Sequence, residues 1–160
     1  MFCKDRMPQH QVPHWFWIKE EIVLQQSIQV TDVDSRRLEM LIEGSRPKDL
    51  RDEGSVALLE SHLDDAEVTP ARGIGPDVVT MNSEVRVRDL DTHEAIVFRV
   101  VFPRAADAAA GRISVLAPLG MAVLGRRVGD HVTWHTPGGR RRLWVDRVLY
   151  QPEREGKDVA

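Results

Sequence analysis

The sequence predicts an α+β protein, in which a short N-terminal antiparallel helical hairpin is followed by an antiparallel sheet domain with one short helix. Apolar residues recur every three or four positions between residues 32 and 66, which is typical of amphipathic helices. From Asp77 onward they alternate with polar residues, which is typical of half-buried strands. Within this alternating region, Pro118 and Gly125 are the start and stop residues of a short helix.

The 160 residues are sufficient for one ordinary domain or two small ones. In chain order we expect an extension of unknown structure at 1–28, a helical hairpin (short coiled coil) at 29–69, a linker at 70–76, a sheet domain at 77–153 and a tail at 154–160. Residues 32–67 hold eleven acidic and five basic residues, whereas residues 77–160 hold eleven and thirteen. This asymmetry favours two modules with different roles.

The hairpin is predicted from two apolar stripes. Asp32 or Asp34 is expected to cap the first helix, and Gly44 to end it. A second helix is expected from about residue 49 to residue 66. The stripes are Leu38, Leu41 and Ile42 in the first helix and Val56, Leu59 and Leu63 in the second. The residues from Val68 to Pro76, rich in proline and glycine, are then predicted to form the linker.

The strands are predicted from alternation after the linker. The positions expected to face the core are Val85, Val87, Ile96, Phe98, Val100, Phe102, Ile113, Val115, Val132 and Trp134. A type II turn at Pro137–Gly138 would lead into a returning strand from Arg141 to Tyr150. The short helix from Pro118 cannot be stable alone in water, so we expect it to lie on the sheet.

Four stretches carry a resemblance to a known family. They are Asp77 to Ser83 (DVVTMNS), Ser114 to Asp130 (SVLAPLGMAVLGRRVGD), Trp134 to Gly139 and Leu149 to Glu153. Together they resemble the C-terminal domain of the Gre transcript-cleavage factors. They resemble more closely the regulator of nucleoside diphosphate kinase (Rnk) family, which has alanine before the proline, as here at Ala117. The resemblance covers roughly residues 29–153 and implies an FKBP-like sheet-and-helix fold.

The resemblance also implies a function. The protein would be a non-enzymatic regulator that binds RNA polymerase at the rim of the secondary channel, without a cofactor. Apart from the resemblance, the sequence has no run long enough for a membrane span and no signal-peptide pattern, so we expect a cytoplasmic protein without a membrane partner. We also expect a monomer, and the net charge of −3 argues against sequence-specific binding of nucleic acid. The residues expected to contact polymerase are Leu116, Ala117, Pro118, Leu119 and Gly120. The hairpin would occupy the channel mouth and compete with Gre-type factors.

The acids near the hairpin tip are the sharpest chemical candidates. Gre factors keep a magnesium-binding acidic pair at the tip of a long coiled coil, and Asp49 and Asp52 have similar spacing here. Asp49, Asp52 and Glu53 equally suit a helix N-terminus, where the helix dipole favours negative charge. Each helix would be only ~20 Å long, which is short for delivering a carboxylate to the polymerase active centre. We therefore predict no metal site, with a cleavage-stimulating factor as the first alternative.

Other classes find less support in the sequence. Cys3 is the only cysteine, which excludes an internal disulfide and favours a reducing compartment. His131 and His135 would lie ~13 Å apart along a strand, too far to share an ion. The cluster Arg140–Arg142 is interpreted as a solvated strand edge. An FKBP-like module that binds another protein is the second alternative; the few aromatic residues disfavour a prolyl isomerase pocket.

Overall fold

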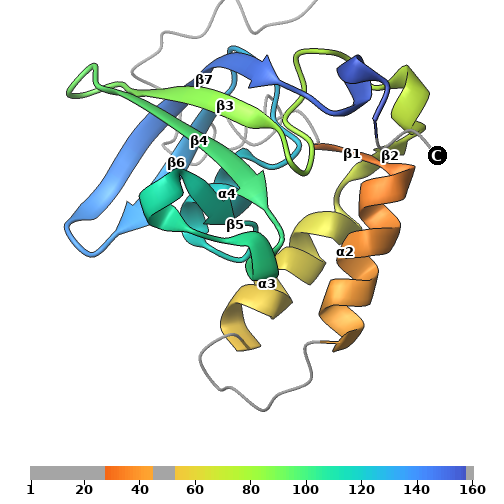
Figure 1. The fold of residues 1–160 in the computed structure, drawn as a ribbon. Helices are drawn as coiled ribbons and strands as arrows, with labels where there is room; N and C mark the ends of the chain where they lie inside the picture. Colours follow the sequence, from red (N-terminus) through yellow and green to blue (C-terminus); the bar gives the residue numbers. More distant parts are fainter. Residues whose placement is uncertain (1–27, 45–52, 158–160) are drawn as a thin grey trace, which may run out of the picture.

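A computed structural model describes residues 28–44 and 53–157. Figure 1 shows a curled sheet above, with helix α4 beneath it and the α2–α3 hairpin below and to one side. The elements are β1 (Gln29–Thr31), α2 (Asp32–Gly44), α3 (Glu53–Asp64), β2 (Glu67–Thr69), η3 (Ala71–Gly73), β3 (Glu84–Asp89), β4 (Ala95–Val101), η4 (Pro103–Ala105), η5 (Ala108–Ala110), β5 (Arg112–Ser114), α4 (Pro118–Val123), β6 (His131–Thr136), β7 (Gly139–Tyr150) and η6 (Glu153–Glu155). No helix in these ranges is long and apolar enough to cross a membrane.

The first helix, α2, ends at Gly44 as predicted but begins earlier than expected, with a different cap. The backbone N–H of Asp34 donates to Oγ1 of Thr31 at 3.0 Å, so Thr31 is the N-cap, and the expected cap at Asp32 or Asp34 is wrong. The two acids are used in other contacts. Oδ1 of Asp32 accepts from the backbone N–H of Ala71, and Oδ2 of Asp34 accepts from that of Met81, each at 3.0 Å. Both acids therefore connect the hairpin to later parts of the chain.

The segment expected to be a linker is partly ordered into a second small sheet. Strands β1 and β2 pair in parallel, with Val30 opposite Val68. Each strand has three residues, which is too few for alternation to be visible in the sequence. After β2, Ala71 is buried and the side chain of Gln151 donates to the carbonyl of Gly75 at 2.8 Å. Val68 and Thr69 are thus strand residues; the division into two modules remains a prediction.

The main sheet has five strands in the order β5-β4-β3-β7-β6. The pairs among β3, β4, β6 and β7 are antiparallel, as expected, but β4 and β5 are parallel. The prediction of a wholly antiparallel sheet is therefore wrong. The chain reverses through η4 and η5 after β4, and it returns in the same direction as β4. Two register shifts between β3 and β7 bend the sheet, because an extra residue in one strand increases local twist.

The β6–β7 hairpin also differs from the prediction in its turn. A type II turn at Pro137–Gly138 requires a positive φ at Gly138. In the structure the positive φ in this hairpin belongs to the next residue, Gly139, at 122°. The tight connection itself is confirmed, since Thr136 pairs with Gly139.

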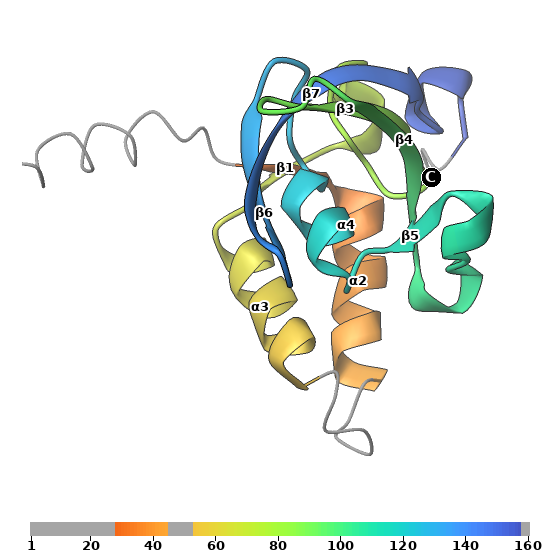
Figure 2. The same ribbon diagram turned by 90° about the vertical axis from the view of Figure 1, so that its left-hand side faces the viewer.

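The hairpin and the sheet domain share one hydrophobic core. The cluster of buried residues includes Val85, Val87, Phe98, Val100, Leu143 and Val145 from the sheet, Leu119 and Val123 from α4, and Ile28, Val30, Leu38 and Leu59 from the N-terminal part. Figure 2 shows α4 beneath the curled sheet, on the side where the hairpin packs. The core therefore fixes how the short helix α4 is presented at the surface.

Candidate partner-binding loop

The loop between β5 and α4 is held in place by backbone contacts. The N–H of Val115 donates to the carbonyl of Val101 at 2.9 Å, which anchors the end of β5 to β4. Ser114 then organises the turn. Its Oγ accepts from the N–H of Leu116 at 3.1 Å, and its carbonyl accepts from the N–H of Ala117 at 3.0 Å. The loop is thereby a fixed turn rather than an open connection.

Pro118 occupies the first position of α4, as the sequence predicts. Ala117 before it has φ −71° and ψ 147°, the extended conformation that a following proline favours. The carbonyl of Ala117 accepts from the N–H of Met121 at 2.9 Å, which closes the first helical turn. Pro118 itself is exposed, and its fixed φ rigidifies the loop at the point where it meets solvent.

The residues predicted to contact polymerase divide into two groups. Leu119 is only 7% exposed and Gly120 is buried, so both face the body of the protein. A Cβ on Gly120 would lie 2.2 Å from the carbonyl oxygen of Ser114, so only glycine fits there. Leu116 and Ala117 are half-buried and Pro118 is exposed. The solvent-accessible part of the loop is therefore Leu116–Pro118, with Leu119 and Gly120 beneath it.

The end of α4 is tied to the N-terminal part of the chain. Gly125 has φ +78°, the left-handed conformation expected from the sequence. Its carbonyl accepts from the N–H of Gln29 at 3.0 Å, and its own N–H donates to the carbonyl of Val79 at 2.8 Å. A Cβ at this position would lie 2.7 Å from Cβ of Ile28. The helix that presents the loop is therefore fixed against the segment that leads into the hairpin.

The predicted tip acids can be placed only in part. Asp49 and Asp52 lie outside the described residues, and of Glu53, the first residue of α3, only the backbone is described. Further along the hairpin, a hollow of about 250 Å³ lies between α2 and α3. It is lined by Ser35, Glu39, Ile42, Glu43, Glu60, Leu63, Asp64 and Val68. In the described part of the chain, no group of three His, Cys, Asp or Glu side chains could hold a metal ion.

The arginine cluster lies at the end of β7 that extends beyond β3. Strand β7 lies between β3 and β6, but its pairing with β3 ends at Leu143. Arg140, Arg141 and Arg142 pair with β6 and are exposed, as expected for a solvated strand edge, and the carbonyl of Arg142 accepts from the N–H of Leu90. Arg141 lies 3.7 Å from Asp89, and Arg142 lies 3.2 Å from Asp91. The backbone N–H groups of Thr92 and Asp91 lower the pKa of the Asp89 carboxyl, and the nearby charge of Arg141 acts in the same direction.

Of the two histidines considered on β6, His131 is exposed, as expected, and the side chain of His135 is not described. The sequence analysis missed His62, which lies on α3. Burial lowers the pKa of its imidazole, and the charge of Arg126 adds to this effect. The signal was its position three residues after Leu59, within the apolar stripe of the helix.

Comparisons with known proteins show which family this chain resembles. The family described as transcription elongation factor GreA/GreB, C-terminal, matches residues 74–150. The regulator of nucleoside diphosphate kinase of Escherichia coli K12 is 37% identical over 131 residues, which are 81% of this chain and 94% of that protein. GreA of Thermotoga neapolitana is 42% identical over 90 residues, which are 56% of this chain and 57% of GreA.

A solved structure has a similar fold over most of the chain. The prokaryotic transcription elongation factor GreA/GreB from Nitrosomonas europaea superposes with a TM-score of 0.64 and 38% identity, covering 79% of this chain and 100% of that chain. The family match and the fold thus define a protein built on the GreA/GreB C-terminal domain. The extent of the match to the Escherichia coli protein shows that the chain belongs to the regulator of nucleoside diphosphate kinase family within that group.

Proposed function

We propose that this protein is a non-enzymatic regulator of transcription, which acts in the cytoplasm as a monomer by binding RNA polymerase near its secondary channel. The observation that carries the proposal is the loop Leu116–Pro118. Ser114 and Gly120 hold it rigidly at the surface of a domain that matches the GreA/GreB C-terminal family. A preformed loop binds with little loss of conformational entropy, which suits a docking contact.

The hairpin would occupy the channel mouth without reaching the active centre. The described helices α2 and α3 have 13 and 12 residues. At 1.5 Å per residue each is ~20 Å long, which is short beside the long coiled coil of Gre factors. We therefore propose that the protein competes with Gre-type factors and slows the transcript cleavage that they stimulate.

Binding to core RNA polymerase tests the proposal. We expect the wild type to retain core polymerase on an affinity resin and an added Gre factor to displace it. Pro118→Ala should weaken binding about tenfold because it relaxes the loop, while the thermal unfolding midpoint stays nearly unchanged. Pro137→Ala, at another exposed proline far along the chain, is the matched control and should bind like the wild type.

A cleavage assay separates this function from its alternatives. Added to a backtracked transcription complex, the wild type should not accelerate cleavage of the RNA 3′ end. Acceleration that Asp52→Asn abolishes would instead favour a cleavage-stimulating factor. Equal polymerase affinity of wild type and Pro118→Ala would remove the loop from the docking surface, and absence of any polymerase binding would favour a module for another protein.

A further inference from the structure

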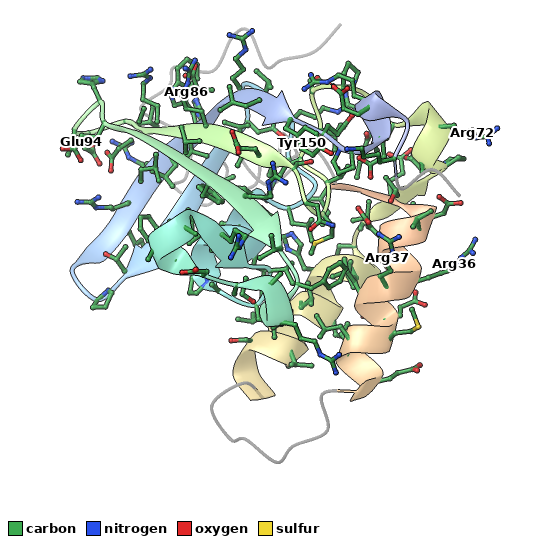
Figure 3. The ribbon with its side chains drawn as sticks, viewed as in Figure 1. Arg36, Arg37, Arg72, Arg86, Glu94 and Tyr150 are labelled. Carbon is green, nitrogen blue, oxygen red and sulfur yellow. The ribbon has the colours of Figure 1, made fainter. Side chains whose placement is uncertain are left out.

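The outer face of the main sheet, turned away from α4, is not used by the proposed function. Along β3, Val85 and Val87 are fully buried, so their neighbours Glu84, Arg86 and Arg88 project to the opposite face. Figure 3 shows Arg86 on this outer side, away from α4. Antiparallel sheets commonly leave one face to solvent, but here that face carries an unusual set of side chains.

The strand register shows which side chains share this face with β3. Arg86 pairs with Arg147 of β7 and Val97 of β4. Arg88 pairs with Trp144. Glu84 lies between Tyr150 of β7 and Arg99 of β4. We call the set Glu84, Arg86, Arg88, Arg99, Trp144, Asp146, Arg147 and Tyr150 the outer arginine face.

Cations exceed carboxylates on this surface. A single carboxylate, Asp146, accepts from Nε of Arg86 at 2.6 Å and from an Nη of Arg88 at 3.5 Å. Arg147 is exposed and pairs with no carboxylate of the described residues. Arg99 lies 3.7 Å from Glu84. Four arginines thus face two acids, which leaves a positive surplus although the whole chain has a net charge of −3.

Aromatic rings lie among these cations. The guanidinium of Arg99 stands 4.7 Å from the centroid of the Tyr150 ring, and Nζ of Lys157 lies 5.9 Å from it. Trp144 is half-buried at the other end of the face. Trp144 and Tyr150 are six residues apart on β7, which is about 20 Å at the rise of a strand. Cations that follow a groove or face and rings on which bases stack are the two features of single-strand binding surfaces.

We propose that the outer arginine face binds single-stranded RNA without regard to its sequence. The choice of RNA rests on the proposed function, because a protein docked on RNA polymerase meets that enzyme's single-stranded product. The guanidinium of Arg147 contacts phosphates, and so do those of Arg86 and Arg88, whose two positive charges share the single carboxylate of Asp146. Trp144 stacks on a base. A duplex fits poorly, because its bases already stack on one another and present no free ring face.

Fluorescence anisotropy with the isolated protein tests this without polymerase. The probe is a fluorescein-labelled 15-nucleotide oligouridine at 50 mM KCl. Wild type should bind saturably, and affinity should fall as salt rises, because counterions are released from the phosphates. Arg147→Glu should weaken binding at least tenfold. Arg72→Glu, the same charge change at an exposed arginine of η3, is the matched control and should change affinity less than twofold.

A gain-of-binding variant tests the same face in the opposite direction. Asp146→Asn removes the carboxylate shared by Arg86 and Arg88, so the RNA affinity should rise about threefold or more. Duplex RNA and polyglutamate serve as competitors and should each compete less well than oligouridine, whereas oligothymidine DNA, which offers the same phosphates and free base faces, should compete about equally. No binding by the wild type, equal losses in Arg147→Glu and Arg72→Glu, or competition by duplex RNA or polyglutamate as good as that by oligouridine would overturn the proposal, whether or not polymerase is bound.

Discussion

At the residue scale, Gly120 shows how a single backbone position decides the shape of the loop between β5 and α4, which we propose to contact polymerase. A Cβ there would lie 2.2 Å from the carbonyl oxygen of Ser114, and that backbone atom cannot move without disturbing the turn into α4. We expect Gly120→Ala to lower the free energy of unfolding by about 1–3 kcal/mol or more, as overpacking does, and to weaken polymerase binding. Chemical denaturation measures the first effect and affinity capture the second.

Gly54 provides the control for this prediction. It lies in α3, and a Cβ on it would meet nothing within 4 Å. Gly54→Ala should therefore leave stability unchanged or raise it by about 0.5–1 kcal/mol, since alanine is the better helix former. If both substitutions had the same effect, the close approach at Gly120 would not be what fixes the loop.

His62 gives the fold a dependence on pH that can be measured. Burial lowers the pKa of its imidazole below the ordinary value of 6.5, so the folded protein holds fewer protons than the unfolded chain in this range. The stabilising contribution of the neutral ring is complete above that value and is lost as the pH falls toward the lowered pKa. We expect the thermal unfolding midpoint to decrease as the pH is lowered from 7 to 5. His62→Gln should make this part of the plot of midpoint against pH flatter. An unchanged slope in the variant would exclude His62 as its cause.

At the scale of elements, the sequence predicted the helices and strands that have a clear hydrophobic period, but it did not predict the three-residue strands β1 and β2. The stripe Leu38, Leu41 and Ile42 and the alternation of β3 predicted their helix and strand, because several residues carried the same period. The strands β1 and β2 have three residues each and no detectable period. The parallel direction of β5 also depends on how the chain reverses through η4 and η5, which no local pattern encodes.

For the candidate loop too, the sequence predicted only the features that single residues favour by their own conformation. The sequence placed Pro118 at the start of α4 and Gly125 at its end, because each has a conformational preference of its own. It did not separate the exposed Pro118 from the buried Leu119 and Gly120. That distinction depends on packing of α4 against the sheet, which is a tertiary effect.

At this scale we predict how much the N-cap of α2 contributes to stability. Thr31 accepts the N–H of Asp34 through Oγ1. Thr31→Ala should destabilise the protein by about 0.5–2 kcal/mol, whereas Thr31→Ser, which keeps the hydroxyl, should cost much less. Urea denaturation of the two variants compares them directly, and a similar loss in both would mean that the methyl group rather than the hydroxyl matters, since Thr31 is fully buried.

At the scale of the whole molecule, the shared core sets how far the two modules are independent. Among the residues that the structure describes, the cluster has eighteen buried members, and four of them lie before the sheet domain: Ile28, Val30, Leu38 and Leu59. The other fourteen belong to the segment from Val79 onward. The domain thus has most of its own core, but the hairpin covers one side of it.

This division predicts the behaviour of a fragment spanning residues 77–160. Each apolar side chain that the fragment lacks contributes about 1.5–3 kcal/mol when buried, and these figures are upper bounds because the unfolded chain already buries some surface. Removing the hairpin also leaves the N–H of Met81 without the carboxylate of Asp34. We therefore expect the fragment to keep its strand signal in circular dichroism but to unfold at a clearly lower temperature than the full chain.

A point variant of the full chain should show a smaller loss. Leu38→Ala should also lower the unfolding temperature, but by less, because it truncates one of the four buried side chains and leaves the hydrogen bond to Met81 in place. A fragment without strand signal would mean that hairpin and sheet form one folding unit, whereas a fragment as stable as the full chain would mean that the shared core contributes little.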